Sequence, residues 1–259
     1  MNDEFARLFT ELIEIVKDLR GPDGCEWDKA QTHDSLTPYL LEEAHEVIDS
    51  IYEHNSSKIK EELGDLLLHI VFQAQIAAEA GEFSIADSLK HINSKLKRRH
   101  PHVFGKTVVN SVNDIKKNWE VIKLKEGRKS LMDGLPHSLP ALLQARRVQE
   151  RAAQVGFDWD AIEPVWAKIA EETVELQDAI ASRNKDEVIA EFGDLLFTLV
   201  NLSRFLEIDP EEALRRTVKK FIRRFQAIEA ELATAGKNIK DTSLTELDEI
   251  WNRLKTTEV

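Results

Sequence analysis

One arrangement of acidic residues occurs twice in this sequence at a fixed spacing, and the repeat restricts the folds that the chain can adopt. A shift of 129 residues carries EEAHEVID at 42–49 onto EETVELQD at 171–178, and ELGDLL onto EFGDLL. Six acidic residues then fall on the same residue type: Glu42, Glu43, Glu46, Asp49, Glu62 and Asp65 on Glu171, Glu172, Glu175, Asp178, Glu191 and Asp194. Further along, KLKRR at 95–99 matches KFIRR at 220–224 at a shift of 125. We therefore expect two copies of one module.

Composition and the spacing of apolar residues predict that both copies are helical. The 259 residues include only ten Gly and seven Pro, and strand-like runs of Val, Ile and Thr are scarce. Apolar residues recur with helical periodicity over 4–19, 37–54, 57–80, 84–99 and 112–125, and again over 139–153, 162–182, 185–206, 210–234 and 244–255. The expected fold class is all-α, with two helical bundles in tandem.

Glycine and proline mark the expected boundaries. The stretch EGRKSLMDGLPHSLP at 126–140 contains two of each, which is typical of a linker or surface loop. We expect an N-terminal domain at 1–126, a linker at 127–138 and a C-terminal domain at 139–259. Pro101 and Gly105 in HPHVFG likewise predict a turn that ends the preceding helix.

Two features predict close packing of helices and association of chains. Gly64 and Gly193 lie inside predicted helices, where glycine costs about 1 kcal/mol relative to alanine, and a close helix approach would explain them. Each copy offers only four or five helices, so its apolar faces would be poorly covered in a single chain. These faces include Leu66, Leu67, Ile70, Leu195, Leu196 and Leu199. We expect a homodimer.

The overall charge narrows the classes of partner. A formal net charge of −12 disfavours binding to a nucleic-acid polymer or to an anionic membrane, while small phosphates with a metal remain suitable ligands. Cys25 is the only cysteine, so the chain forms no internal disulfide and fits a reducing compartment. The N-terminal MNDEFARLF is acidic, and no apolar stretch approaches membrane-spanning length. The expected location is the cytoplasm.

The repeated acids predict a metal site. Acidic runs on helices are usually solvated faces, and EEAHEVID taken alone fits that interpretation. However, Glu62 and Asp65 stand one turn apart on the next predicted helix, beside an apolar face. If the two helices are antiparallel neighbours, Glu43, Glu46, Glu62 and Asp65 converge on one point, as do Glu172, Glu175, Glu191 and Asp194. Such a group of oxygen donors suits a hard cation.

The type of ligand indicates which cation. Sites made of carboxylates suit Mg²⁺, Mn²⁺ or Ca²⁺, whereas zinc usually recruits His or Cys. Mg²⁺ keeps several waters and completes its shell with substrate phosphates, which favours a phosphorylated substrate. A di-iron site is an alternative, because Glu42 and His45 form one Glu-x-x-His pair. The second copy has Val174 at the position of His45, so this pair is not part of the repeat.

Basic residues late in each copy are candidate phosphate ligands. In the second copy these are Lys219, Lys220, Arg223 and Arg224, and in the first Lys95, Lys97, Arg98 and Arg99. Their alternative interpretation is a solvated face. Trp119 and Trp251, near the end of each copy, are more often core residues, although an indole can stack on a base.

The motifs resemble a known family. The segments GPDGCEWDKAQTHDSLTPYLLEEAHEVIDSI, EELGDLLLHIVFQAQIAAEAGEF and RRHPHVFG resemble the MazG-type nucleoside triphosphate pyrophosphohydrolases in their tandem form. The family pattern of EExxE followed by ExxD is present in both copies. The resemblance implies an all-α fold that associates in dimers, and Mg²⁺-dependent cleavage of nucleoside triphosphates between the α and β phosphates.

The resemblance and the residues together predict the site. Glu172, Glu175, Glu191 and Asp194 are expected to hold Mg²⁺, or Mn²⁺ in its place, with Glu171 as a further catalytic acid that accepts a proton from water. The predicted substrate-binding residues are Lys168, Asp194, Lys220, Arg223, Arg224 and Trp251. A second possible site consists of Glu43, Glu46, Glu62 and Asp65.

The second copy is expected to carry most of the catalysis. Lys168 stands one helical turn before Glu172, whereas the first copy has Tyr39 at the matching position. A cation there favours triphosphate binding, and the resemblance agrees, since tandem members with an active C-terminal unit are known. Three alternatives stay open: two working copies, a phosphohydrolase that releases orthophosphate, and a helical interaction module without enzymatic activity.

Overall fold

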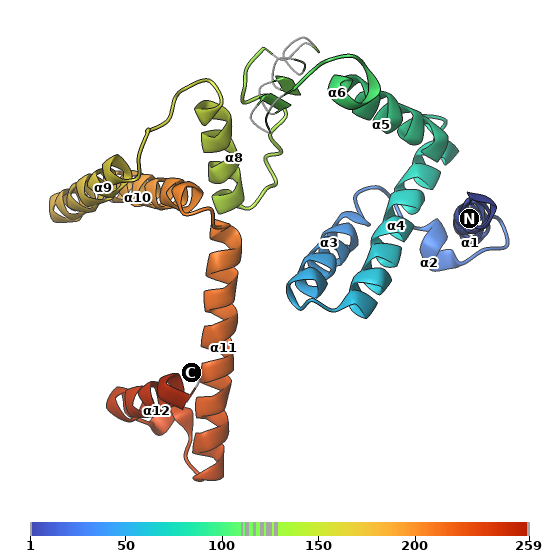
Figure 1. Ribbon diagram of the computed structural model, residues 1–259. Helices are drawn as coiled ribbons and strands as arrows, with labels where there is room; N and C mark the ends of the chain where they lie inside the picture. The colour runs from blue at the N-terminus through green and yellow to red at the C-terminus, as the bar shows by residue number, and fades with distance from the viewer. Residues whose placement is uncertain are drawn as a thin grey trace. The chain divides into compact units, whose positions relative to one another are not determined.

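The computed structural model describes residues 2–109 and 129–257, together with residues 111, 114, 115, 118, 119, 122 and 126. Within these residues the regular structure is helical and contains no strand, which confirms the all-α prediction (Figure 1). The chain divides into two compact units, 1–110 and 111–259. The predicted helix at 112–125 falls largely outside the described residues. The domain limits and the linker at 127–138 therefore stay predictions.

The first unit is built around one long helix. Its elements are α1 (Asn2–Arg20), α2 (Glu26–Lys29), α3 (Thr37–Tyr52), α4 (Ser56–Glu79), α5 (Ile85–Arg99) and α6 (Pro101–Phe104). α4 packs on α3, α1 and α5. The hydrophobic core of this unit contains Val16, Leu36, Val71 and Phe72. The Asn55 side chain accepts hydrogen bonds from the backbone N–H groups of Ser57 and Lys58, which starts α4 directly after a short turn. α3 and α4 thus form an antiparallel hairpin.

The helices α5 and α6 lie at the end of the first unit. α5 ends at Arg99, so the predicted helix end before HPHVFG is confirmed. Pro101 then begins the single helical turn of α6, because proline fits the first position of a helix. The start of α5 is a capping box in which Ser84 and Asp87 bond each other's backbone N–H groups. The Ser84 hydroxyl also donates to Asp87 Oδ2 at 2.6 Å, and this bond, with the one from the Ser84 backbone N–H and the contact with Lys90, lowers the pKa of Asp87 to about 2.

The second unit repeats the hairpin and extends it. Its elements are α8 (Ala141–Ala153), α9 (Glu163–Ser182), α10 (Lys185–Phe205), α11 (Pro210–Thr234), a 3₁₀ turn (Ile239–Asp241) and α12 (Leu244–Thr257). Arg183 adopts a left-handed conformation (φ 61°) and Asn184 caps α10, so α9 and α10 are joined by a two-residue turn. α11 packs mainly on α8 and α12. Ile228, Leu232 and Ile250 form the core between α11 and α12.

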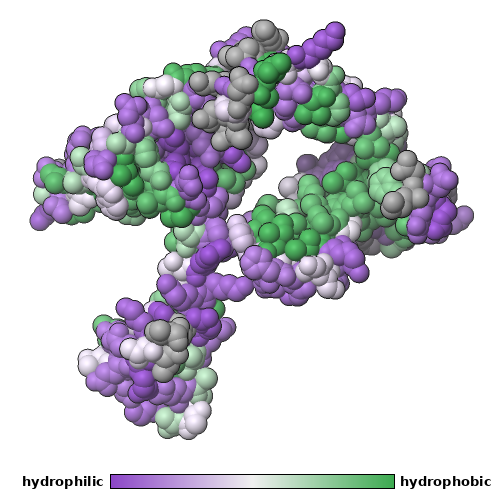
Figure 2. Space-filling model, viewed as in Figure 1, coloured by the Kyte–Doolittle hydropathy of each residue, from purple (hydrophilic) through white to green (hydrophobic). Residues whose placement is uncertain are grey.

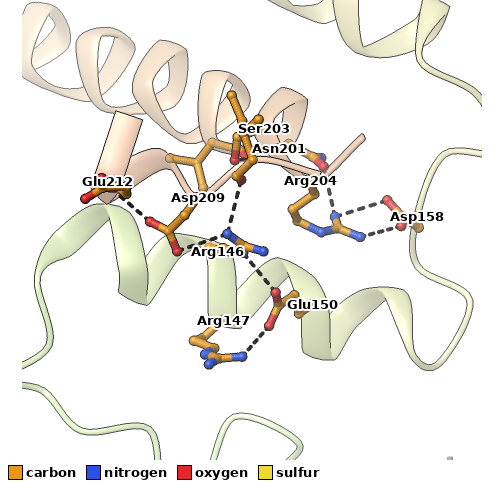
Figure 3. A network of polar contacts seen from close by, with 11 residues as sticks. Arg146, Arg147, Glu150, Asp158, Asn201, Ser203, Arg204, Asp209 and Glu212 are labelled. Carbon is orange, nitrogen blue, oxygen red and sulfur yellow. Dashed lines mark hydrogen bonds and ion pairs between the residues drawn. The ribbon is translucent and has the colours of Figure 1, made fainter. Parts of the chain in front are cut away.

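A polar network fixes α8 against the junction of α10 and α11 (Figure 3). Arg146 donates from Nη1 to the backbone oxygen of Ile208 and to Asp209 Oδ2, both at 3.1 Å, and from Nε to Glu150 at 3.0 Å. Burial of Glu150 opposes ionisation, but hydrogen bonds from Arg146 and Arg147 lower its pKa overall. Asp209 also caps α11 by accepting from the N–H of Glu212. The direction in which α11 leaves α10 is therefore set by side-chain bonds.

Each unit leaves apolar side chains exposed on its hairpin. Ile70, Leu196 and Leu199 are exposed as expected, whereas Leu66, Leu67 and Leu195 are partly buried. Figure 2 shows apolar surface over α3–α4 in one unit and over α9–α10 in the other. The close approach predicted at Gly64 and Gly193 is wrong for the single chain, because a Cβ there would meet no described atom within 4 Å beyond its chain neighbours and the backbone of its own helix. Among the described helices, none is long and apolar enough to cross a membrane.

Candidate metal centre

In both units the hairpin gathers acidic side chains from its two helices. Glu172 and Glu175 on α9 and Glu191 on α10 offer oxygens within 4.8 Å of one another, and Glu43, Glu46 and Glu62 do the same on α3 and α4. Glu172 is the most enclosed, at 4% exposure. The fourth predicted acids, Asp65 and Asp194, lie one turn after these groups on α4 and α10 and are not members of them. Three of four predicted ligands converge in each unit.

Charge repulsion inside each cluster shows in the pKa values. Burial and the neighbouring Glu172 raise the pKa of Glu175. In the first unit burial, then Glu46, Asp65 and Glu62, raises the pKa of Glu43. Burial and Glu46 likewise raise the pKa of Glu62. A cation between the carboxylates would remove this repulsion, and oxygen-only donors suit a hard divalent ion. The residues present therefore fit the predicted metal.

Lys168 lies at the edge of the second-unit cluster, as its spacing predicted. Its Nζ is 2.6 Å from Glu171 Oε1 and 2.8 Å from Glu172 Oε1. The hydrogen bonds to these carboxylates raise the pKa of Lys168, so the ammonium stays charged at neutral pH. A fixed positive charge thus stands beside the acids, where an anionic ligand can meet both.

The first unit has aromatic groups in place of this lysine. Tyr39 is stacked on His69 with ring centroids 6.5 Å apart, and it approaches Trp27 edge-on with ring centroids 6.1 Å apart. His69 Nε2 is 4.0 Å from Glu43 Oε1. Burial lowers the pKa of His69, which favours the neutral imidazole.

The sequence analysis did not select His69. It stands four residues after Asp65 on α4, a spacing that places both on one helix face. At the shift of 129 the second unit has Thr198 in this position. This difference between the copies was the signal by which the sequence could have singled out His69.

The predicted residues of α11 and α12 form a separate group. The guanidinium of Arg224 lies 5.4 Å from the centre of the Trp251 ring, and Phe221 contacts the same ring at 5.2 Å. Lys220 and Arg223 lie on the exposed part of α11. α11 packs mainly on α8 and α12, not on the α9–α10 hairpin. Within one chain, the structure does not gather Lys220, Arg223, Arg224 and Trp251 around the acids, and their binding role stays a prediction.

Two tandem all-α units with a carboxylate cluster in each hairpin define a narrow class of protein. The model of the MazG nucleotide pyrophosphohydrolase domain matches this chain twice, at residues 31–104 and 161–228. Both acidic hairpins fall inside the matched segments. The chain belongs to this family.

Relatives match over nearly the whole length. The nucleoside triphosphate pyrophosphohydrolase/pyrophosphatase MazG of Thermotoga maritima is 50% identical over 97% of each chain. The nucleoside triphosphate pyrophosphohydrolase of Escherichia coli K12 is 40% identical over 96% of this chain and 97% of its own. The uncharacterized protein YabN of Bacillus subtilis is 44% identical over 96% of this chain, which corresponds to 52% of its own. The alignments with the Thermotoga maritima and Escherichia coli proteins cover nearly the whole of both partners.

Proposed function

We propose that this protein hydrolyses nucleoside triphosphates between the α and β phosphates, and releases a nucleoside monophosphate and pyrophosphate in a Mg²⁺-dependent reaction. The observation that carries the proposal is the cluster of Glu172, Glu175 and Glu191 with Lys168 at its edge. It lies in a segment matched by the family. The names of the Thermotoga maritima and Escherichia coli relatives support the same activity.

Each residue has a distinct task in this proposal. Glu172, Glu175 and Glu191, with Asp194 one turn further along α10, would hold Mg²⁺ or Mn²⁺. When bound, the metal would neutralise charge on the phosphates and make a water molecule more acidic. Lys168 binds a phosphate oxygen in exchange for one of its two carboxylate contacts. Glu171 is exposed and next to the cluster, so it is placed to accept a proton from water once Lys168 turns to the substrate.

The products decide between this reaction and its alternatives. Phosphorus NMR on a panel of nucleoside triphosphates with Mg²⁺ should detect monophosphate and pyrophosphate. Diphosphate with orthophosphate would instead identify a phosphohydrolase that attacks the terminal phosphorus. No turnover, together with nucleotide binding no tighter than that of an unrelated acidic protein in calorimetry, would favour an interaction module.

We also infer that the protein is a homodimer. Leu196 and Leu199 are about two-fifths exposed on α10, beside the open face at Gly193, and a second copy would bury them. Association would also let α11 of one copy approach the acids of the other, which would give Lys220, Arg223, Arg224 and Trp251 access to substrate.

Light scattering tests this assembly. The wild type should give twice the chain mass of 29.6 kDa, and Leu196→Glu should give the mass of one chain, because a charge is costly in an apolar interface. Gln177→Glu, on the exposed part of α9, is the matched control and should remain dimeric. A fully active wild-type monomer at micromolar concentration would contradict the inference.

A further inference from the structure

The turn that joins the two helices of each hairpin contains a residue in an unusual backbone conformation. Arg183, between α9 and α10, has a φ of 61°, and His54, between α3 and α4, has a φ of 53°. The shift of 129 residues carries one of these positions onto the other. Residues other than glycine rarely adopt this left-handed region, because the Cβ approaches a backbone carbonyl oxygen. Such a conformation persists where neighbouring groups hold it, so each turn needs contacts that fix it.

In the second unit, Glu187 supplies these contacts. Its Oε1 accepts a hydrogen bond from Asn184 Nδ2 at 2.7 Å, and its Oε2 is 2.9 Å from Ser182 Oγ. Ser182 is the last residue of α9, Asn184 caps α10, and Glu187 lies in the first turn of α10. The backbone N–H of Asn184 also donates to Ser182 Oγ at 3.2 Å. This clasp of Ser182, Asn184 and Glu187 therefore connects the residues on both sides of Arg183.

The first unit makes the same connection with different chemistry. At the shift of 129, Glu53 and Lys58 occupy the positions of Ser182 and Glu187, and Lys58 Nζ is 3.0 Å from Glu53 Oε2. An ion pair thus spans the first turn, whereas hydrogen bonds to a carboxylate span the second. Both contacts are exposed, and exposed contacts contribute little to the free energy of unfolding. Overall stability therefore does not explain why both turns are bridged.

The clasp lies on the faces of α9 and α10 that carry the acids. Ser182 follows Glu175 by seven residues on α9, so the two share one helix face. Glu187 precedes Glu191 by four residues on α10 and shares its face in the same way. The two helices pack side by side (Figure 1). A slip of α10 by one residue would turn Glu191 by about 100° around the helix axis, away from Glu175. The turn therefore decides whether the acids converge.

We propose that Glu187 is a positioning residue for the metal, which acts through the turn and keeps Glu175 and Glu191 at the separation that binds a divalent cation. Its own carboxylate is not a member of the acidic cluster, and both of its oxygens are engaged in the clasp. The assignment rests on the proposed function, in which this cluster holds Mg²⁺ or Mn²⁺. The ion pair of the first unit has the same task in its own hairpin.

Removal of the carboxylate tests this role. Glu187→Ala loses both contacts between the clasp and the first turn of α10. The Mg²⁺ concentration for half-maximal turnover should rise by about ten-fold, the lower end of the range for residues that orient metal ligands. At saturating Mg²⁺, kcat should stay within about two-fold of the wild-type value, because the acids themselves are unchanged. Thermal melting followed by circular dichroism establishes that the variant is folded.

Two further variants separate the clasp from the loss of a negative charge. Asp186→Ala removes the neighbouring carboxylate, which belongs to neither contact of Glu187, and should keep the wild-type dependence on Mg²⁺. Ser182→Glu combined with Glu187→Lys builds the ion pair of the first unit into the second turn, and should restore that dependence. Like Glu187→Ala, each of these proteins carries one negative charge fewer than the wild type. Equal weakening by Asp186→Ala, or no recovery in the double variant, would overturn the proposal.

Mn²⁺ binding tests the same role without turnover. In a Glu43→Gln background, which weakens the first-unit cluster, electron paramagnetic resonance of free Mn²⁺ gives the dissociation constant of the second-unit cluster. This constant should rise by about ten-fold in Glu187→Ala and stay unchanged in Asp186→Ala. An unchanged constant in a folded Glu187→Ala protein would overturn the proposal.

A milder variant answers the question if Glu187→Ala does not fold. Ser182→Ala removes only one contact of the carboxylate and should raise the dissociation constant for Mn²⁺ by about two-fold or more. No rise would overturn the proposal. If pyrophosphate is not produced but Mn²⁺ binding depends on Glu187 as described, the proposed reaction fails and the positioning role stands.

Discussion

The two hairpins hold the same acids and differ in what stands beside them. In α9–α10 a lysine ammonium bonds two carboxylates of the cluster, at 2.6 and 2.8 Å. In α3–α4 the matching position is Tyr39, which stacks on a histidine that burial keeps neutral. The first arrangement offers a positive charge to a triphosphate, and the second offers only aromatic surface. The difference teaches that a duplicated hairpin can keep the same cluster of acids while a single neighbouring residue changes the charge beside that cluster.

Chelation should have the largest effect, because it acts on both hairpins at once. With excess EDTA, turnover should fall to background, since the carboxylates alone provide no positive charge for the phosphates. Added Mg²⁺ should restore it. Release of pyrophosphate measured by a coupled assay gives the answer, and full activity in EDTA would remove the metal from the proposed reaction.

Substitution of one acid in each hairpin separates the two clusters. Glu172→Gln should lower turnover by roughly 100-fold or more, because a metal ligand contributes several kcal/mol to stabilisation of the transition state. Glu43→Gln should leave most of the turnover intact. Steady-state kinetics on variants shown to be folded decides the order. The reverse result would assign catalysis to the first unit, and a half loss in each would indicate two working sites.

Exchange of the neighbouring residue tests the cause of the inequality. Lys168→Met should raise KM for the triphosphate by about ten-fold, since a charge-assisted hydrogen bond to phosphate is worth about 1.5–3 kcal/mol.

In a Glu172→Gln background, Tyr39→Lys should increase binding of a nonhydrolysable triphosphate with Mg²⁺, as measured by calorimetry. Tyr39→Phe is the control for loss of the phenol. Equal binding by the Glu172→Gln protein with Tyr39, with Tyr39→Lys and with Tyr39→Phe would show that the lysine does not explain the difference between the two units.

The smallest effect concerns pH and the metal-free protein. In the folded protein the pKa of Glu175 is raised above its ordinary value of 4.5. At a pH between the ordinary and the raised pKa, the folded state therefore binds more protons than the unfolded state. Its ionisation therefore lowers stability as pH rises through the raised pKa. Without metal, Glu175→Gln should melt slightly above the wild type at pH 7, and the gap should close as pH falls toward 4.5. Groups far from Glu175, such as His69 in the first unit, contribute equally to both proteins and cancel in the difference. A gap independent of pH would contradict this origin.

Local patterns were predictable from the sequence. The α9 and α10 helices were expected at 162–182 and 185–206 and occur at Glu163–Ser182 and Lys185–Phe205, because helical periodicity and caps act over a few residues. The convergence of Glu172, Glu175 and Glu191 was predictable for the same reason. Once two antiparallel helices are joined by a short turn, the positions along each helix determine which side chains meet.

Features that depend on distant packing were not predictable. A close helix approach at Gly193 was predicted from the cost of glycine within a helix. In the single chain, however, no neighbouring helix among the described residues approaches this face of α10 at Gly193. A cavity lined by Gln149 and Phe197 forms where α8, the loop before α9 and α10 meet, and no short stretch of sequence encodes such a meeting. The separation of Trp251 from the acids follows from the network of Arg146 and Asp209, which directs α11 away from the hairpin.

The two-residue turn at Arg183 and Asn184 affects how the acidic cluster of the second unit folds and how it can be duplicated. Glu172 and Glu191 are close in the chain as well as in space, so the cluster assembles through short-range contacts, which form rapidly during folding. All its acids come from one continuous helical hairpin. Copying that single stretch of gene therefore copies the whole acidic cluster, and leaves each copy free to acquire different neighbours.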